Sequence, residues 1–141
     1  MNINERIIRE TCAAAEGSSL DAEKFVSMFT HNGYMLDMAS GTKFVGKAIG
    51  DSIASLASAF PDVHRDIAKV HVAGDVVVVE LAIRGTHTGE LKLPSGALAP
   101  TGRTIDVPSC DVFQLENGKI KSFHCYNEAS VLLTQLGVGL T

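Results

Sequence analysis

Near the carboxyl end of the chain, a predicted β-hairpin gathers side chains that can move protons. Its turn is Asn117-Gly118, the strongest short hairpin signal, because both central residues of a type I′ turn need positive φ. Counting outward from this turn pairs Asp111 with His124. Since side chains alternate between the faces of a strand, Tyr126 and Glu128 should lie on the same face as this pair. A β-bulge would shift this register by one residue.

These four side chains form a plausible acid/base set. Asp111 can hold the imidazole of His124 in one tautomer, which leaves the other ring nitrogen to act on a ligand. Tyr126 can donate a hydrogen bond to a developing enolate oxygen, and Glu128 can move a proton. The alternative is a solvated outer face with a chance ion pair, and spacing alone favours neither interpretation.

Four further positions are predicted to line a ligand pocket. Tyr34 and Asp37 lie in a short predicted strand over residues 34–38, and Phe113 shares the hairpin face of Asp111. His64 follows Phe60-Pro61-Asp62 at a helix-to-strand corner. For Asp37 and His64 the competing interpretation is an ordinary solvated surface residue.

Composition limits the class of protein. The 141 residues fit one domain, and 45% hydrophobic content is enough for a core. A net charge of -4 without a basic run argues against nucleic acid, and no stretch is long enough to span a membrane. The histidines and cysteines lack metal-ligand spacing, so we expect no metal or cofactor. The amino-terminal residues do not resemble a signal peptide, and three cysteines suit reduced thiols in the cytoplasm.

The order of predicted elements indicates an α+β fold. Helices are expected over residues 3–16, from Ser19 or Asp21 through Phe29, and over 46–60. Between the last two lie short strands at 34–38 and 42–45. Strands are then expected at 63–72, 76–84, 104–115 and 119–127, with a long arm at 85–103 and a helical turn at 129–136. We treat 1–141 as a single domain.

Several short pieces, in this order, resemble the SnoaL-like polyketide cyclases of the nuclear-transport-factor-two-like superfamily. They are Phe60-Pro61-Asp62, Gly85-Thr86-His87-Thr88-Gly89, Pro100-Thr101-Gly102-Arg103, Asp111-Val112-Phe113, Asn117-Gly118-Lys119-Ile120 and Gln135-Leu136-Gly137. Each piece alone is weak, but the ordered set covers nearly the whole chain. It is specific for the fold and subfamily, and not for a reaction.

The resemblance implies a cone-shaped α+β barrel, in which a curved mixed or antiparallel sheet wraps around amino-terminal helices and encloses a pocket, commonly in a homodimer. It also implies ring closure on a polyketide ester by an intramolecular aldol step, without metal or cofactor. Counted from Gly118-Lys119-Ile120, His124 falls where the family often has Trp, and Glu128 falls at the acid/base Asp. This double departure leaves open a different proton transfer or simple ligand binding.

The leading hypothesis is therefore an acid/base enzyme of the cyclase or isomerase type acting on a small carbonyl compound. Glu128 would be the base, with a pKa raised by apolar surroundings, and Tyr126 the oxyanion donor. The second hypothesis is a non-catalytic ligand-binding or assembly module. A weaker third is epoxide hydrolysis around Glu80 and Arg84, for which a second acid is missing.

We also expect a homodimer. The hairpin register leaves four residues on the face opposite the proposed site, and a strand apolar on both faces is usually covered on both sides. The alternative is that the arm at 88–103 covers this face within one chain. The four residues are Cys110, Val112, Phe123 and Cys125.

Overall fold

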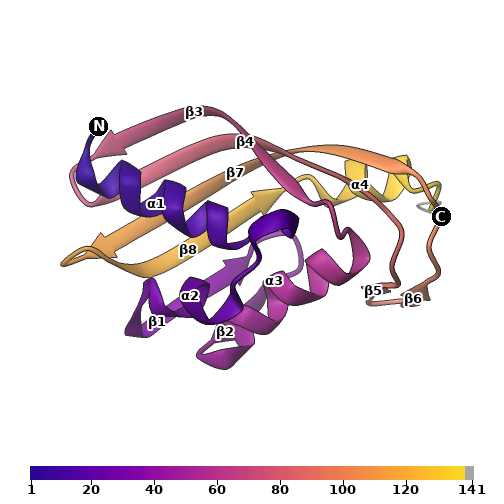
Figure 1. The fold of residues 1–141 in the computed structure, drawn as a ribbon, viewed down its shortest axis with the longest axis horizontal. Coiled ribbons are helices and arrows are strands. Elements are labelled where there is room, and N and C mark those ends of the chain that lie inside the picture. Colours follow the sequence, from indigo (N-terminus) through magenta and orange to yellow (C-terminus); the bar gives the residue numbers. More distant parts are fainter. Residues whose placement is uncertain (139–141) are drawn as a thin grey trace.

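The computed structural model describes residues 1–138, which form helices and one curved sheet (Figure 1). The fold class is α+β, as the order of predicted elements indicated. The elements in chain order are α1 (Ile3–Ala14), the 3-10 turn η1 (Gly17–Ser19), α2 (Ala22–Ser27), β1 (Phe29–Asp37), β2 (Thr42–Val45), α3 (Lys47–Ala59), β3 (His64–Ala73), β4 (Val76–Thr86), β5 (Leu91–Leu93), β6 (Gly96–Leu98), β7 (Thr104–Glu116), β8 (Lys119–Asn127) and α4 (Ala129–Gln135).

Local sequence chemistry accounts for several of these boundaries. The side chain of Asn2 accepts hydrogen bonds from the first backbone N–H groups of α1, and Asp21 does the same for α2. Asn117 and Gly118 have φ values of 50° and 78°, as the predicted turn between β7 and β8 requires. The second helix ends earlier than expected, and Phe29 begins β1 instead of facing inward from a helix.

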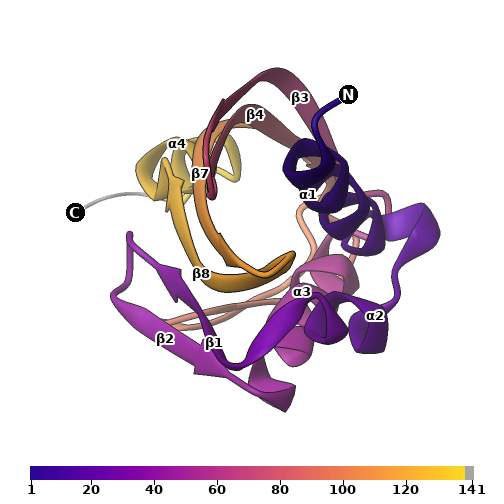
Figure 2. The same cartoon turned by 90° about the vertical axis from the view of Figure 1, so that its left-hand side faces the viewer.

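Six strands form one sheet in the order β2-β1-β8-β7-β4-β3. The β1–β8 pair is parallel and the other pairs are antiparallel, so the sheet is mixed. Figure 2 shows the sheet curling from β2 around to β3, with α1, α2 and α3 on its open side. The arm at 85–103 contains a separate two-stranded hairpin of β5 and β6.

The concave side of the sheet packs on these helices and forms the main hydrophobic core. Its fully buried side chains come from α1, α3 and the central strands, and include Ile8, Ile49, Val77, Val79, Phe113 and Ile120. No helix within residues 1–138 is long and apolar enough to cross a membrane.

The predicted register of the last hairpin is wrong beyond its first two pairs. Glu116 pairs with Lys119 and Leu115 with Ile120, as counted from the turn, but the register then shifts and Lys121 is left as an extra residue. After this bulge Asp111 lies opposite Cys125, and His124 lies opposite Val112. Because one extra residue reverses the faces of everything beyond it, Asp111 and His124 do not share a face.

Candidate active site

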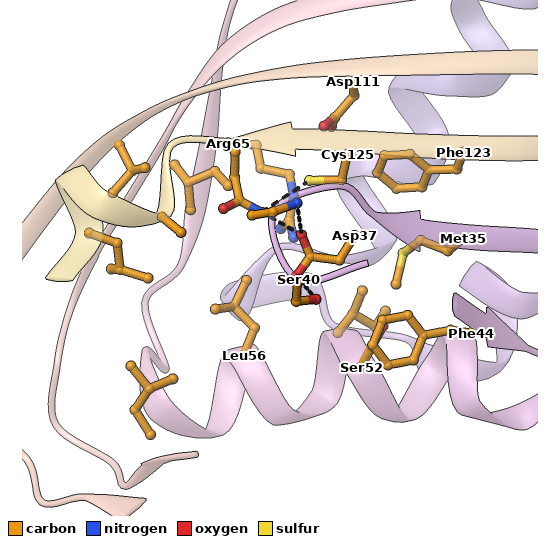
Figure 3. Close-up of a pocket in the computed structure, with 18 of the residues that line it drawn as sticks. Met35, Asp37, Ser40, Phe44, Ser52, Leu56, Arg65, Asp111, Phe123 and Cys125 are labelled. Atoms are coloured by element: carbon orange, nitrogen blue, oxygen red, sulfur yellow. Dashed lines mark hydrogen bonds between the residues drawn. The ribbon is translucent and has the colours of Figure 1, made fainter. Parts of the chain in front are cut away.

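The space between the concave face of the sheet and the helices holds a cavity of about 510 Å³ (Figure 3). Its walls are mostly apolar. Aromatic and thioether side chains line one part of it, namely Phe25, Met35, Phe44, Phe113 and Phe123. Aliphatic side chains from α3, β5, β7 and α4 line another part, including Leu56, Leu91, Ile105 and Leu132. A volume of this size suits a small organic molecule.

Asp111 is the carboxyl group that strand β7 places in this cavity. Alternate β7 residues face inward, and all of them are buried. Asp111 is 3% exposed, and its Oδ1 atom has no hydrogen-bond partner within residues 1–138. Burial raises the pKa of Asp111 to about 6, while the positive charge of Arg65 and the polar groups of Cys125 and Ser109 oppose the rise. The carboxyl group therefore changes its charge near neutral pH.

A second polar cluster lies at the carboxyl ends of β1 and β8. Asp37 accepts hydrogen bonds at Oδ1 from the Asn127 side-chain amide (3.2 Å) and from the backbone N–H of Ala39 (3.1 Å). The Ser40 hydroxyl donates to Oδ2 at 3.0 Å. Figure 3 shows Asp37 and Ser40 below Cys125. The carboxylate of Asp37 is therefore partnered, in contrast to that of Asp111.

Two thiols and one guanidinium also belong to the lining of the cavity. Cys12 comes from α1, Cys125 from β8 and Arg65 from β3. Burial, helped by the nearby charge of Asp111, raises the pKa of each thiol to about 12. Both cysteines are therefore neutral in the folded protein at physiological pH, and they act as polarisable wall groups.

Three of the eight predicted site residues line this cavity: Asp37, Asp111 and Phe113. The other five do not. His124 lies on the outer side of the sheet, where its Nε2 atom is 3.0 Å from the hydroxyl group of Tyr34. Tyr126 is 46% exposed on β8, and Glu128 is exposed at the start of α4.

His64 also lies outside the cavity. Its side chain is 61% exposed, and its Nδ1 atom is 3.1 Å from the Glu16 carboxylate. The faces of β3 explain this, because successive residues alternate and Arg65, the next residue, is the one that lines the cavity.

Sequence reasoning missed most of the polar cavity residues, among them Cys12, Arg65, Cys125 and Asn127. A signal for Arg65 was present, because Val63, Arg65 and Ile67 alternate along a predicted strand with apolar neighbours on either side. For Cys125 and Asn127 the signal was hidden by the bulge at Lys121. Within residues 1–138, no group of three or more His, Cys, Asp or Glu side chains is placed to hold a metal ion.

Comparisons with known proteins agree with this architecture. Residues 8–136 match the sequence profile of the family described as SnoaL-like polyketide cyclase. Comparison with curated proteins gives no match.

Solved structures give close fold matches. A protein from Catenulispora acidiphila with a ketosteroid isomerase-like fold, in complex with trimethylamine, is 25% identical with a TM-score of 0.77, over 94% of this chain and 93% of that one. A candidate SnoaL-like polyketide cyclase from Jannaschia sp. is 19% identical with a TM-score of 0.82, over 97% and 93%. IdmH, a candidate polyketide cyclase from Streptomyces antibioticus, is 19% identical with a TM-score of 0.76, over 96% and 99%.

Proposed function

The chain belongs to the SnoaL-like polyketide cyclase family, and from that premise we propose that it is an acid/base enzyme of the cyclase or isomerase type, with Asp111 as the base. Its substrate is a small carbonyl compound bound in the cavity. Glu128, at the position that the family resemblance suggested, is exposed and outside the cavity lining, so we assign its role to Asp111.

The observation that carries this proposal is that Asp111 is buried in the cavity with a raised pKa and with a carboxyl oxygen that is unpartnered in the described part of the chain. A general base works best when its pKa lies near the working pH, and burial brings the pKa of Asp111 to about 6. Its Oδ1 atom has no competing partner among residues 1–138. A carboxylate in water is a weaker base, because its pKa is near 4.

The proposed step begins when a C–H bond next to the carbonyl group breaks. The proton passes to Asp111, and the electron pair moves into an enolate. In an isomerisation, Asp111 returns the proton to a different carbon. In an aldol closure, the enolate carbon bonds to a second carbonyl carbon of the same molecule, and the new alkoxide oxygen takes the proton from Asp111.

Deuterium exchange tests this step without knowledge of the natural substrate. The probe is 2-tetralone, an apolar ketone with acidic C–H bonds, incubated with the protein in D₂O and followed by mass spectrometry. We expect Asp111→Asn to lower protein-catalysed exchange by about 10²–10⁴-fold. Asp106→Asn, an exposed position on the same strand, is the matched control and should leave the rate unchanged. Glu128→Gln separates Asp111 from Glu128 as the base. Loss of deuterium exchange in Glu128→Gln, with exchange retained in Asp111→Asn, would refute the assignment to Asp111.

A second candidate function is the binding of a small organic amine without turnover. The ring centroids of Phe113 and Phe123 are 4.3 Å apart, and both rings line the cavity beside Asp111. Aromatic faces and a carboxylate together attract an organic ammonium ion. The trimethylamine complex of the Catenulispora protein supports this possibility. Calorimetric titration with trimethylamine tests it: binding that disappears in Asp111→Asn, with no exchange into 2-tetralone, would favour this function.

The protein is also proposed to form a homodimer through the outer face of the sheet. On this face Val112 lies between Val78 and His124, and Leu36 follows next to His124. Phe123 and Cys125, which the sequence assigned to this face, line the cavity instead. The arm at 88–103 does not provide the cover, since its residues 91–94 also line the cavity.

Light scattering tests the dimer directly. A charge in the middle of an apolar interface is costly to bury, so Val112→Lys should give a monomer mass at a concentration where the unmodified protein is a dimer. Lys47→Ala, at an exposed position at the start of α3 and away from the outer face of the sheet, is the control. A monomer mass for the unmodified protein at micromolar concentration would overturn the proposal.

We further propose a cytoplasmic location. Cys12, Cys110 and Cys125 are all free thiols, and free thiols are typical of a reducing compartment. Fractionation of the source cells tests this, and recovery of the protein outside the cytoplasm would contradict it.

A further inference from the structure

Arg65 is the guanidinium that β3 directs into the cavity (Figure 3). Its neighbours at alternate positions, Val63 and Ile67, belong to the buried side of the strand, where apolar side chains are the rule. A positive charge in such a row needs a reason, because moving a charge away from water is costly unless it is paired.

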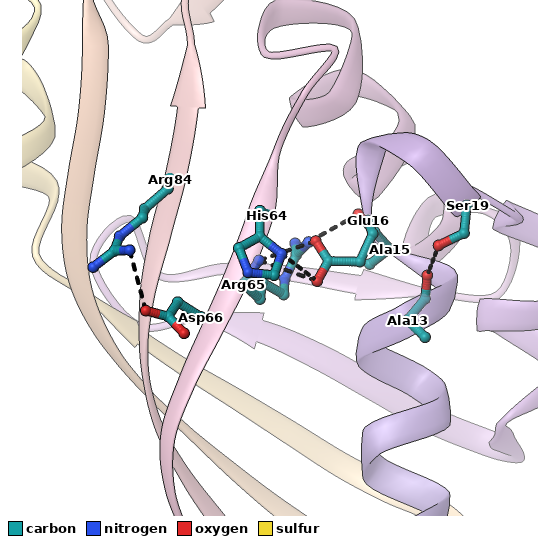
Figure 4. Close-up of polar contacts among 8 residues, drawn as sticks. All are labelled: Ala13, Ala15, Glu16, Ser19, His64, Arg65, Asp66 and Arg84. Carbon is teal, nitrogen blue, oxygen red and sulfur yellow. Dashed lines mark hydrogen bonds and ion pairs between the residues drawn. The ribbon is translucent and has the colours of Figure 1, made fainter.

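The backbone and one nitrogen of Arg65 are fixed by the end of helix α1 (Figure 4). The backbone N–H of Arg65 donates to both oxygens of the Glu16 carboxylate, at 3.0 and 3.2 Å. Nη1 of Arg65 donates to the backbone carbonyl of Ala15 at 2.8 Å. The bond from Nη1 anchors one end of the guanidinium without neutralising its charge, since the acceptor is a neutral carbonyl.

No carboxylate among residues 1–138 forms an ion pair with the Arg65 side chain. Arg84, on the neighbouring strand, contrasts with it, because its guanidinium pairs with Asp66 at 3.2 Å and Asp106 at 3.4 Å on the outer face. A guanidinium has five N–H donors, and one of those of Arg65 is used by Ala15. The remaining donors are available to a ligand in the cavity.

We propose that Arg65 is the oxyanion site of this cavity, where it holds the carbonyl oxygen of an enolisable substrate while Asp111 takes the proton from the adjacent carbon. This inference rests on the proposed function. As the C–H bond breaks, negative charge develops on the carbonyl oxygen, and a fixed positive group in a largely apolar cavity stabilises it more strongly than water does. The same positive charge limits the rise in the pKa of Asp111.

The apolar side chains around Asp111 and Arg65 narrow the substrate class. Phe123 and Met35 lie to the right of Asp111 in Figure 3, and Leu56 on α3 lies below Arg65. The substrate class is therefore an enolisable ketone or ester with largely apolar substituents.

A phenolate is a stable analogue of an enolate, and it provides a test by absorbance. The probe is 4-nitro-1-naphthol, whose neutral and ionised forms absorb at different wavelengths. A pH titration of free and bound probe gives the ratio of naphtholate to naphthol affinity. We expect the unmodified protein to prefer the naphtholate. The preference should fall about tenfold or more in Arg65→Met, because an opposite charge at close range typically shifts ionisation by that amount.

Two matched variants make the measurement decisive. Arg65→Lys keeps the positive charge and should retain most of the preference for naphtholate. Arg84→Met removes one arginine from the neighbouring strand with the same change of net charge, and it should leave the preference unchanged. Circular dichroism checks folding, and Arg65→Gln replaces Arg65→Met if the latter does not fold.

The inference is overturned if the unmodified protein prefers neutral naphthol, or if Arg65→Met and Arg65→Gln keep the preference. Equal losses in Arg84→Met and Arg65→Met would also overturn it, because they would indicate a general effect of net charge. Failure of the proposed function looks different. If Asp111 is not the base, deuterium exchange is unaffected by Asp111→Asn, while the dependence of naphtholate binding on Arg65 persists.

Discussion

Asp111 and Cys125 lie directly opposite each other across β7 and β8, and both side chains line the cavity. Each changes the ionisation of the other. The carboxylate raises the pKa of the thiol, while the thiol opposes the rise in the pKa of the carboxyl group. The pair is therefore stable with the thiol neutral and one exchangeable proton near the carboxylate, which suits a proton-transfer site.

Asp111→Asn should change the way in which the stability of the protein depends on pH. The pKa of Asp111 is raised from 3.8 to about 6, so between these values the folded chain holds more protons than the unfolded chain. The free energy of unfolding therefore falls as the pH rises through this window. A pKa difference of about two units corresponds to a change of about 3 kcal/mol in the free energy of unfolding.

Because Asn is neutral throughout, we expect the stability of Asp111→Asn relative to the unmodified protein to increase from about pH 4 to about pH 7, by up to about 3 kcal/mol. Urea denaturation at both pH values, at constant ionic strength, measures the difference. An equal difference at the two pH values would show that Asp111 does not titrate in this window.

Cys12 and Cys125 should resist alkylation in the folded protein. Alkylating reagents attack the thiolate, and burial raises the pKa of both thiols from 9.0 to about 12. At pH 8 this lowers the thiolate fraction roughly a thousandfold. Mass spectrometry after a timed reaction with iodoacetamide, with and without urea, gives the protection of each residue. Rapid labelling of Cys12 without urea would contradict the burial of this part of α1.

Gly89→Ala should disturb the hairpin that closes one part of the cavity. The backbone N–H of Gly89 donates to the carbonyl of Ala59 at 3.0 Å, and a Cβ atom at Gly89 would lie 1.9 Å from the carbonyl oxygen of Ser58. The arm must therefore move away from α3, at a cost of about 1–3 kcal/mol typical of overpacking. Since Leu91 and Leu93 line the cavity, 4-nitro-1-naphthol should also bind more weakly.

Thermal denaturation and the probe titration measure both effects. Ala97→Ser, on the exposed β6 strand of the same hairpin, is the control and should change neither quantity appreciably. Unchanged stability in Gly89→Ala would show that the arm is not held against α3 in solution.

The fold could be predicted from sequence because its signals are local. Asn117-Gly118 specified the last turn, Pro61 marked the end of α3, and alternation in 104–115 placed Asp111 and Phe113 on one buried face. The small strands β5 and β6 within the arm were not predicted, since three-residue strands leave no periodic signal.

The partner of Asp111 could not be predicted, for a physical reason. Pairing was counted from the turn, and the single extra residue, Lys121, exchanges the faces of every residue that follows it in β8. His124 and Tyr126 thus moved to the outer face, while Cys125 and Asn127 moved into the cavity. A bulge has no sequence signal comparable to Asn-Gly, so the error was confined to one strand and yet affected most of the predicted site.

Substitutions in β8 can distinguish the observed register, with its bulge at Lys121, from the register counted from the Asn117-Gly118 turn. In the observed register the thiol of Cys125 opposes the rise in the pKa of Asp111, so Cys125→Val, which replaces the thiol with an apolar group of similar size, should raise the pKa of Asp111 above its value of about 6. His124→Val is the matched control, because His124 lies on the outer face next to Tyr34 and does not face Asp111. The Asp111 carboxyl signal in a ¹³C NMR titration measures both changes. A shift in His124→Val with none in Cys125→Val would show that β8 pairs as the turn alone predicts and that the bulge at Lys121 is absent.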